Sequence, residues 1–179
     1  MLRTSVPLIG ALGVIEFSFM KTVEPVRFES RPGMLLAGIR RQHDFATAQV
    51  SIPNQWAEFR SSGPMANRAG SDAYGVTCGH SQTSFEYMCA VEVHSYDGIP
   101  DGTGRMTVPG QRYAIFVHEG PMPTIGETWQ DILNWLVADK YESAHTPDFE
   151  RYDSHFIPGA PSNKVEIWVG IKPKSRDVA

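Results

Sequence analysis

The sequence predicts an α+β fold in which one module occurs twice. Two segments, 50–60 and 124–140, repeat apolar residues with the period of a helix, whereas the segments around them alternate with the period of a strand. Each half of the chain, about 23–98 and 105–173, runs from an extended segment through one amphipathic helix to a pair of strands. If the halves pack side by side, their junction is the place to expect a concave ligand pocket.

Composition is that of an ordinary soluble globular protein. The chain has 179 residues, of which 41% are hydrophobic and 20% charged, so it can bury a core as one domain or as two small halves. A formal net charge of −4 gives no electrostatic reason to expect a nucleic acid partner. Two cysteines, Cys78 and Cys89, are too few for a disulfide framework, and we interpret them as reduced core residues of a cytoplasmic protein.

Residues 1–22 are predicted to be an apolar extension of the domain. One arginine precedes an apolar run, as in a signal peptide, but Glu16 interrupts the run and no small-residue cleavage motif follows. The run is also too short and too broken to span a bilayer, so we expect no membrane association. An apolar segment exposed to water promotes aggregation, and we therefore expect it to bury itself on a second subunit in a homodimer.

The first half begins with two extended pieces, 26–30 and 34–41. Pro32 and Gly33 lie between them, which predicts one strand with a kink. The helix over 50–60 follows, with Ile52, Trp56 and Phe59 at the spacing i, i+4, i+7.

A hairpin is predicted to complete the first half. Segments 72–77 and 84–94 have the composition and alternation of two antiparallel strands joined by a short turn.

The second half repeats this order. Strands are predicted at 105–108 and 111–119, broken at Pro109 and Gly110. The helix over 124–140 should begin with a capping box formed by Thr124 and Glu127. Its expected apolar stripe is Trp129, Ile132, Leu133 and Leu136, and Trp135 falls outside that stripe, where it would line a groove or an interface.

Two strands are predicted to end the domain, a short one over 148–156 and a longer one over 164–173, before a polar tail, 174–179. In the longer strand Val165, Ile167, Val169 and Ile171 share one face. Glu166 and Trp168 share the other face, and a carboxylate beside a large aromatic ring suggests a cationic, partly apolar ligand. The alternative is a half-exposed glutamate beside a tryptophan that shields a sheet edge.

Four segments resemble, in order and spacing, the GyrI-like or AraC-type effector-binding domain family. They are 109–120 (PGQRYAIFVHEG), Thr128-Trp129 with 134–136 (NWL), 148–152 (DFERY) and 165–169 (VEIWV). The resemblance extends over about 23–173 and implies a tandem pair of βαββ-type modules with an antiparallel sheet, two main helices and a groove between the halves.

The resemblance also implies a function. Members of the family are fused to helix-turn-helix regulators, where they sense cationic or amphipathic drugs, or stand alone as small-molecule binders, gyrase-inhibitory proteins or hydrolases of cyclopropane-containing genotoxins. The residues before Val23 are too few for a helix-turn-helix domain, so we expect no direct DNA binding. The binding site implied by the family places its buried carboxylate at Glu166. The pocket aromatics would be Tyr113, Trp129, Tyr152 and Trp168, with Tyr87 and Phe85 less surely placed.

Three hypotheses follow. The first is a stand-alone module that binds cationic or amphipathic aromatic compounds, with Glu166 neutralising the charge and the aromatic residues supplying contact area. The second is a hydrolase in which Glu166 acts as general base for a water molecule. The third is an interaction protein that modulates a topoisomerase such as gyrase. We expect no metal or other cofactor, since the six histidines are scattered and the cysteines lie eleven residues apart.

Overall fold

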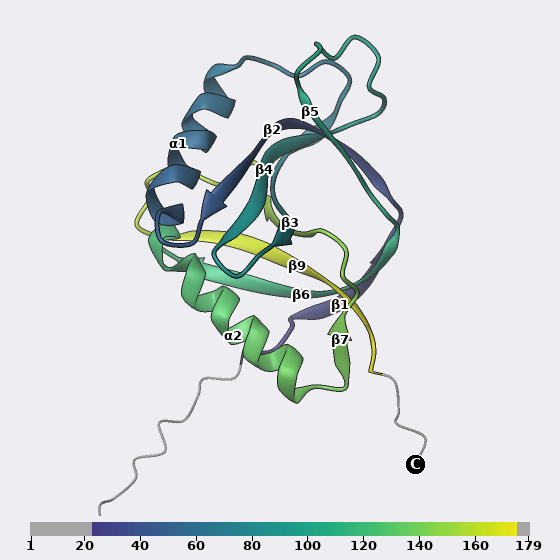
Figure 1. Cartoon of the computed structure of the whole chain (residues 1–179), viewed down its shortest axis with the longest axis vertical. Coiled ribbons are helices and arrows are strands. Elements are labelled where there is room, and N and C mark those ends of the chain that lie inside the picture. Colours follow the sequence, from purple (N-terminus) through teal and green to yellow (C-terminus); the bar gives the residue numbers. More distant parts are fainter. Residues whose placement is uncertain (1–22, 175–179) are drawn as a thin grey trace, which may run out of the picture.

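The computed structural model describes residues 23–174, which form one curled antiparallel sheet with two α-helices packed outside it (Figure 1). The predicted extension, 1–22, and the tail from residue 175 lie outside the described residues. The strands are β1 (Arg27–Arg31), β2 (Met34–Asp44), β3 (Arg68–His80), β4 (Ser84–Val93), β5 (Gly104–Val108), β6 (Gln111–Gly120), β7 (Tyr141–Ser143), β8 (Asp148–Tyr152) and β9 (Asn163–Pro173). The helices are α1 (Ala48–Ser61), the short 3₁₀ helix η1 (Met122–Thr124) and α2 (Ile125–Ala138).

The predicted duplication is visible in the strand pairing. In the first half β2 pairs with β4 and β4 with β3, with α1 connecting β2 to β3. In the second half β6 pairs with β9 and β9 with β8, and α2 lies between β6 and β8 in the chain. Strands β3 and β8 pair with each other and join the halves. The predicted α+β class and the two-helix architecture are therefore confirmed.

A long bent ribbon closes the curl. Strand β1 pairs with β6 and β2 with β5, and the residue offset is the same on both sides of the bend, from Arg31 opposite Gln111 to Met34 opposite Val108. The kink predicted around Pro32 and Gly33 therefore occurs within a continuous pair of strands. At the bend Gly33 approaches the other strand so closely that a Cβ atom would lie 3.0 Å from the Val108 carbonyl oxygen.

The sheet has two faces with separate cores. Side chains from strands on every side of the curl meet in one apolar cluster, which defines the inner face and includes Tyr113, Phe149 and Trp168. On the outer face Phe116 and Ile167 pack against Ile132 and Trp135 of α2. Helix α1 also lies on the outer face, over β2 and β4 (Figure 1).

The predicted surface of α2 needs two corrections. The side chain of Thr124 makes no cap hydrogen bond, and its hydroxyl donates instead to the Pro121 carbonyl at 2.9 Å, so the predicted capping box is absent. Leu133, placed on the apolar stripe, is 52% exposed. Trp135 takes the buried position instead, with its ring 5.2 Å from that of Phe116, because the helix turns the Trp129, Ile132 and Trp135 side towards the sheet.

Helix α1 differs from its prediction in what it buries. It begins at Ala48, two residues earlier than expected, and contains Pro53. The predicted stripe of Ile52, Trp56 and Phe59 is only half buried, and the fully buried residue of α1 is the polar Gln55.

Three smaller features complete the comparison. The strand predicted over 148–156 ends at Tyr152, and the three-residue strand β7 was not predicted. Cys78 and Cys89 are both unpaired, as expected. None of the described helices is long and apolar enough to cross a membrane.

Candidate functional site

Strand β8 carries the acidic residue at the centre of the candidate site. Its residues alternate between the faces: Phe149 belongs to the inner core, whereas Glu150 lies opposite Ile167 and therefore faces the helices. Glu150 is 6% exposed. Since β8 pairs with β3 where the halves meet, this carboxylate lies at the junction of the two modules.

Three aromatic side chains donate hydrogen bonds to the Glu150 carboxylate. Oε2 accepts from the hydroxyls of Tyr152 at 2.6 Å and Tyr87 at 2.8 Å. Oε1 accepts from the indole Nε1 of Trp129 at 2.8 Å. Burial and the charge of Glu150 raise the pKa of both tyrosines well above the ordinary phenol value, so both stay protonated and remain donors.

Each helix supplies one indole to this site. Trp129 comes from α2, and Trp56 of α1 donates from Nε1 to the Tyr87 hydroxyl at 3.2 Å. The Trp56 ring also meets the Tyr152 ring edge-on, with centroids 5.0 Å apart. The carboxylate therefore lies within a wall of four aromatic side chains.

Gly75 of β3 makes room for this arrangement. It pairs with Glu150 across the two strands. A Cβ atom at Gly75 would lie 1.9 Å from the Tyr87 hydroxyl oxygen and 2.7 Å from Glu150 Oε2. A side chain at this position would have to displace the Tyr87 hydroxyl and the Glu150 carboxylate.

Among the side chains that the structure describes, the Glu150 carboxylate has no cationic partner. The salt bridges among these side chains pair other carboxylates with arginine, lysine or histidine. A buried carboxylate held only by neutral donors is costly to desolvate, and a positive charge beside it would offset that cost.

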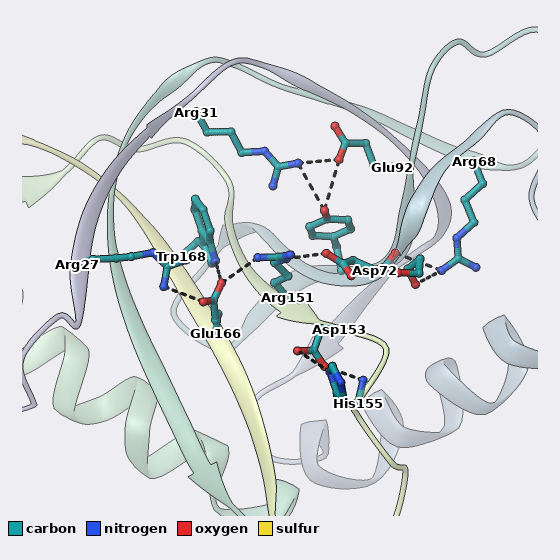
Figure 2. Close-up of polar contacts among 12 residues, drawn as sticks. Arg27, Arg31, Arg68, Asp72, Glu92, Arg151, Asp153, His155, Glu166 and Trp168 are labelled. Atoms are coloured by element: carbon teal, nitrogen blue, oxygen red, sulfur yellow. Dashed lines mark hydrogen bonds and ion pairs between the residues drawn. The ribbon is translucent and has the colours of Figure 1, made fainter.

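Glu166, the carboxylate implied by the family resemblance, lies on the inner face and is ion-paired (Figure 2). Arg27 donates to Oε1 at 2.7 Å, Arg151 donates to Oε2 at 3.2 Å, and the Trp168 indole donates to Oε2 at 3.0 Å. Partial burial raises the pKa of Glu166, but hydrogen bonds from Arg27 and Trp168 and the charges of both arginines outweigh it and hold this pKa below its usual value.

The six aromatic residues named from the sequence divide between the two faces. Tyr87, Tyr152 and Trp129 surround Glu150. Trp168 and Tyr113 lie in the inner core, with their ring centroids 5.5 Å apart. Phe85 lies on the helix side of β4, with its ring stacked on that of Phe45 at 5.0 Å.

Two surface cavities lie beside the segment between β8 and β9. Their volumes are about 220 and 420 Å³, and Asp153 and Lys164 line both. The smaller one reaches Glu166 and Arg151. Neither is lined by Glu150, which is covered by its aromatic neighbours.

Sequence reasoning missed Glu150 and Trp56 as site residues. A signal for Glu150 was present, because Glu150 and Tyr152 alternate onto the same face of a strand. Tyr152 is expected from the family resemblance to line a pocket with Glu166, yet its hydroxyl donates to the carboxylate of Glu150 on its own strand. Trp56 carried no such signal, since its role depends on how α1 is seated.

A model of the GyrI-like small molecule binding domain matches residues 24–172. The chain belongs to this family. Residues 24–172 therefore form a GyrI-like small-molecule binding domain.

Among curated proteins, the chain resembles the transcriptional regulator BrlR of Pseudomonas aeruginosa. The two are 35% identical over 101 residues, which is 55% of this chain and 37% of the regulator. The GyrI-like chain thus spans little more than a third of that relative.

Two solved structures share the fold. One is SAV2435 bound to tetraphenylphosphonium, with a TM-score of 0.68 and 17% identity over 82% of this chain and 93% of the other. The second is an integron cassette protein of Vibrio cholerae, with a TM-score of 0.62 and 21% identity over 84% of this chain and 97% of the other.

Proposed function

We propose that this GyrI-like chain binds lipophilic aromatic cations, with Glu150 as the residue that neutralises the ligand's charge. The observation that carries the proposal is the buried Glu150 carboxylate, which accepts three hydrogen bonds from neutral aromatic donors and has no salt bridge among the side chains that the structure describes. The tetraphenylphosphonium bound to SAV2435 supports this ligand class.

The aromatic wall suits a cation with a large apolar body. Indole and phenol rings attract a positive charge through their faces and offer apolar contact area to ligand rings. The phenol and indole hydrogen bonds would keep the carboxylate in place while the ligand supplies the missing positive charge. In this proposal Glu166 has a different role, since its charge is already met by Arg27 and Arg151.

Calorimetric titration with two ions of the same shape tests the proposal. Tetraphenylphosphonium is a cation and tetraphenylborate an anion, so contact area is matched while charge is reversed. Wild-type protein is expected to bind the cation and to bind the anion at least tenfold more weakly, because a buried carboxylate attracts the first and repels the second. The variant Glu150→Gln should lose most of this preference. Equal affinity of the wild type for both ions would overturn the proposal.

A further inference from the structure

Glu150 is closed off from solvent in this structure, so a ligand can reach it only if part of the wall moves. Glu150 is 6% exposed, and it lines neither of the two cavities described above. The wall on one side is Trp56 of α1, and on the other it is Trp129 of α2. The way in which each helix is attached to the sheet therefore decides which side opens.

Helix α1 is attached through a buried polar cluster. The Gln55 side chain, 1% exposed, donates from Nε2 to the carbonyls of Ile39 at 2.7 Å and Tyr87 at 3.2 Å. Its Oε1 therefore accepts a hydrogen bond from the Nε2–H group of His43, 2.5 Å away. His43 Nδ1 is then the acceptor for the Ser51 hydroxyl at 2.6 Å. This network fixes the histidine tautomer and links α1 to strands β2 and β4.

The same cluster is linked directly to the Glu150 site. Gln55 immediately precedes Trp56, whose indole donates to the Tyr87 hydroxyl. The Tyr87 backbone accepts from Gln55, while its hydroxyl donates to Glu150. Movement of Gln55 away from the sheet would therefore carry Trp56 away from the carboxylate.

Helix α2 provides an internal comparison. Thr128 immediately precedes Trp129, and its hydroxyl lies 2.8 Å from Nδ1 of His118 on β6, as Ser51 lies beside His43 in the first half. However, α2 also buries Ile132 and Trp135 in the apolar core of the outer face. Apolar burial is non-directional, so α2 keeps its position when one hydrogen bond is lost.

We propose that α1 is the movable wall of the Glu150 site, and that Ser51, Gln55 and His43 form the latch that keeps it closed. The inference rests on the proposed function in taking Glu150 as the ligand carboxylate. The inference is based on how the two helices are attached to the sheet. The one fully buried side chain of α1 is polar and is held by a few directional hydrogen bonds, whereas α2 is held by an apolar core.

Binding kinetics of matched variants test the latch. Gln55→Met replaces the amide with an apolar group of similar length, and Thr128→Val removes the α2 hydroxyl beside His118, the counterpart of the Ser51 hydroxyl in α1. Tetraphenylphosphonium is mixed with each protein, and tryptophan fluorescence is followed in a stopped-flow instrument. Gln55→Met should raise the association rate constant roughly tenfold or more, because it removes the three hydrogen bonds that the Gln55 side chain makes. Thr128→Val should change it by less than about twofold. Equal acceleration by both variants, or none with Gln55→Met, overturns the inference.

Amide hydrogen exchange of the ligand-free protein gives a second readout that does not depend on ligand binding. In the wild type, amides of α1 should exchange faster than those of α2, and Gln55→Met should accelerate exchange in α1 selectively. Acceleration throughout the domain would mean that the variant acts through global unfolding, and would contradict the latch. If the wild type fails to bind tetraphenylphosphonium, the proposed function fails, and selective α1 exchange still decides the latch.

Discussion

Glu150 and Glu166 lie on neighbouring strands, yet they face opposite sides of the same sheet. Each accepts a hydrogen bond from a tryptophan indole, Glu150 from Trp129 and Glu166 from Trp168. The remaining partners differ: Glu150 has two tyrosine hydroxyls, whereas Glu166 has two arginines. The residues that surround a carboxylate, rather than its burial beside an aromatic ring, thus distinguish a candidate ligand group from part of an ion-pair network.

The arginines around Glu166 explain its place in the fold. Arg27 comes from β1 and Arg151 from β8, and Arg151 also donates to Asp72 of β3 at 2.7 Å. The network therefore links four strands across the curl (Figure 2). Arg27 also lies over the Trp168 ring, 5.4 Å from its centroid. We infer that Glu166 stabilises the closed curl.

The largest expected effect comes from filling the space between β3 and Glu150. Gly75→Ala would place a methyl group 1.9 Å from the Tyr87 hydroxyl oxygen, which must then move off Glu150. We expect a loss of about 1–3 kcal/mol in the free energy of unfolding, the usual cost of overpacking. Urea denaturation of the wild type and the variant measures this loss in the free energy of unfolding.

Gly126→Ala is the matched control for that substitution. Gly126 lies in α2, and a Cβ atom there would meet no other atom within 4 Å. Because alanine has a higher helix propensity than glycine, the substitution should raise the free energy of unfolding by about 0.5–1 kcal/mol. If Gly75→Ala proves as stable as wild type, the close packing around Glu150 described above is incorrect.

The next effect in size separates Glu166 from Glu150. Glu166→Gln leaves two arginines without their shared anion, and should lower the free energy of unfolding at neutral pH by about 1–2 kcal/mol. The pKa of Glu166 is lowered in the folded protein. Its contribution to the free energy of unfolding is therefore present at pH values above the unfolded pKa of about 4.3, and it is lost as the pH falls through the folded pKa. The difference between wild type and variant should therefore shrink in acid. A constant difference from pH 7 to pH 2 would argue against the ion pairs.

The last prediction concerns a third carboxylate, Asp148, at the start of β8, and it is a change of slope with pH rather than a loss of stability at one pH. Burial raises its pKa to about 7, although the Gly170 amide donates a hydrogen bond to it at 2.8 Å. A raised pKa means that its stabilising contribution is complete below the unfolded value of about 3.9 and is lost as pH rises through about 7. Asp148→Asn should flatten the pH dependence of the melting temperature in this window. An unchanged slope would show that Asp148 titrates normally.

The sequence was a good guide to the fold because its signals are local. Alternation along 84–94 and helical spacing over 124–140 each report which side of one element is apolar. The kink at Pro32 could be read in the same way, because proline restricts its own backbone. The sequence could not show how each helix is oriented on the sheet. Whether Trp135 or Leu133 faces the sheet depends on contacts with Phe116, which belongs to a different element, β6.

The site was harder to predict because it depends on which strand faces meet. The alternation of side chains along a strand shows that Glu166 and Trp168 share a face. It does not show that this is the inner face, where arginines of β1 and β8 reach the Glu166 carboxylate. Tyr87, Tyr152 and Trp129 were named from the family resemblance, and the structure brings these three together. Glu150, the partner that these three share, could be identified only by knowing that β8 pairs with β3 where the two halves meet.

Calorimetry of Glu150→Gln and Glu166→Gln with tetraphenylphosphonium, side by side, tests the central distinction most directly. We expect Glu150→Gln to lower the affinity by about tenfold or more, since the ligand loses the buried counter-charge that Glu150 supplies. We expect Glu166→Gln to stay within about threefold of wild type at a temperature where both variants are folded. If instead Glu166→Gln loses the cation and Glu150→Gln binds it like wild type, then the ion-paired Glu166 is the ligand carboxylate and Glu150 is not.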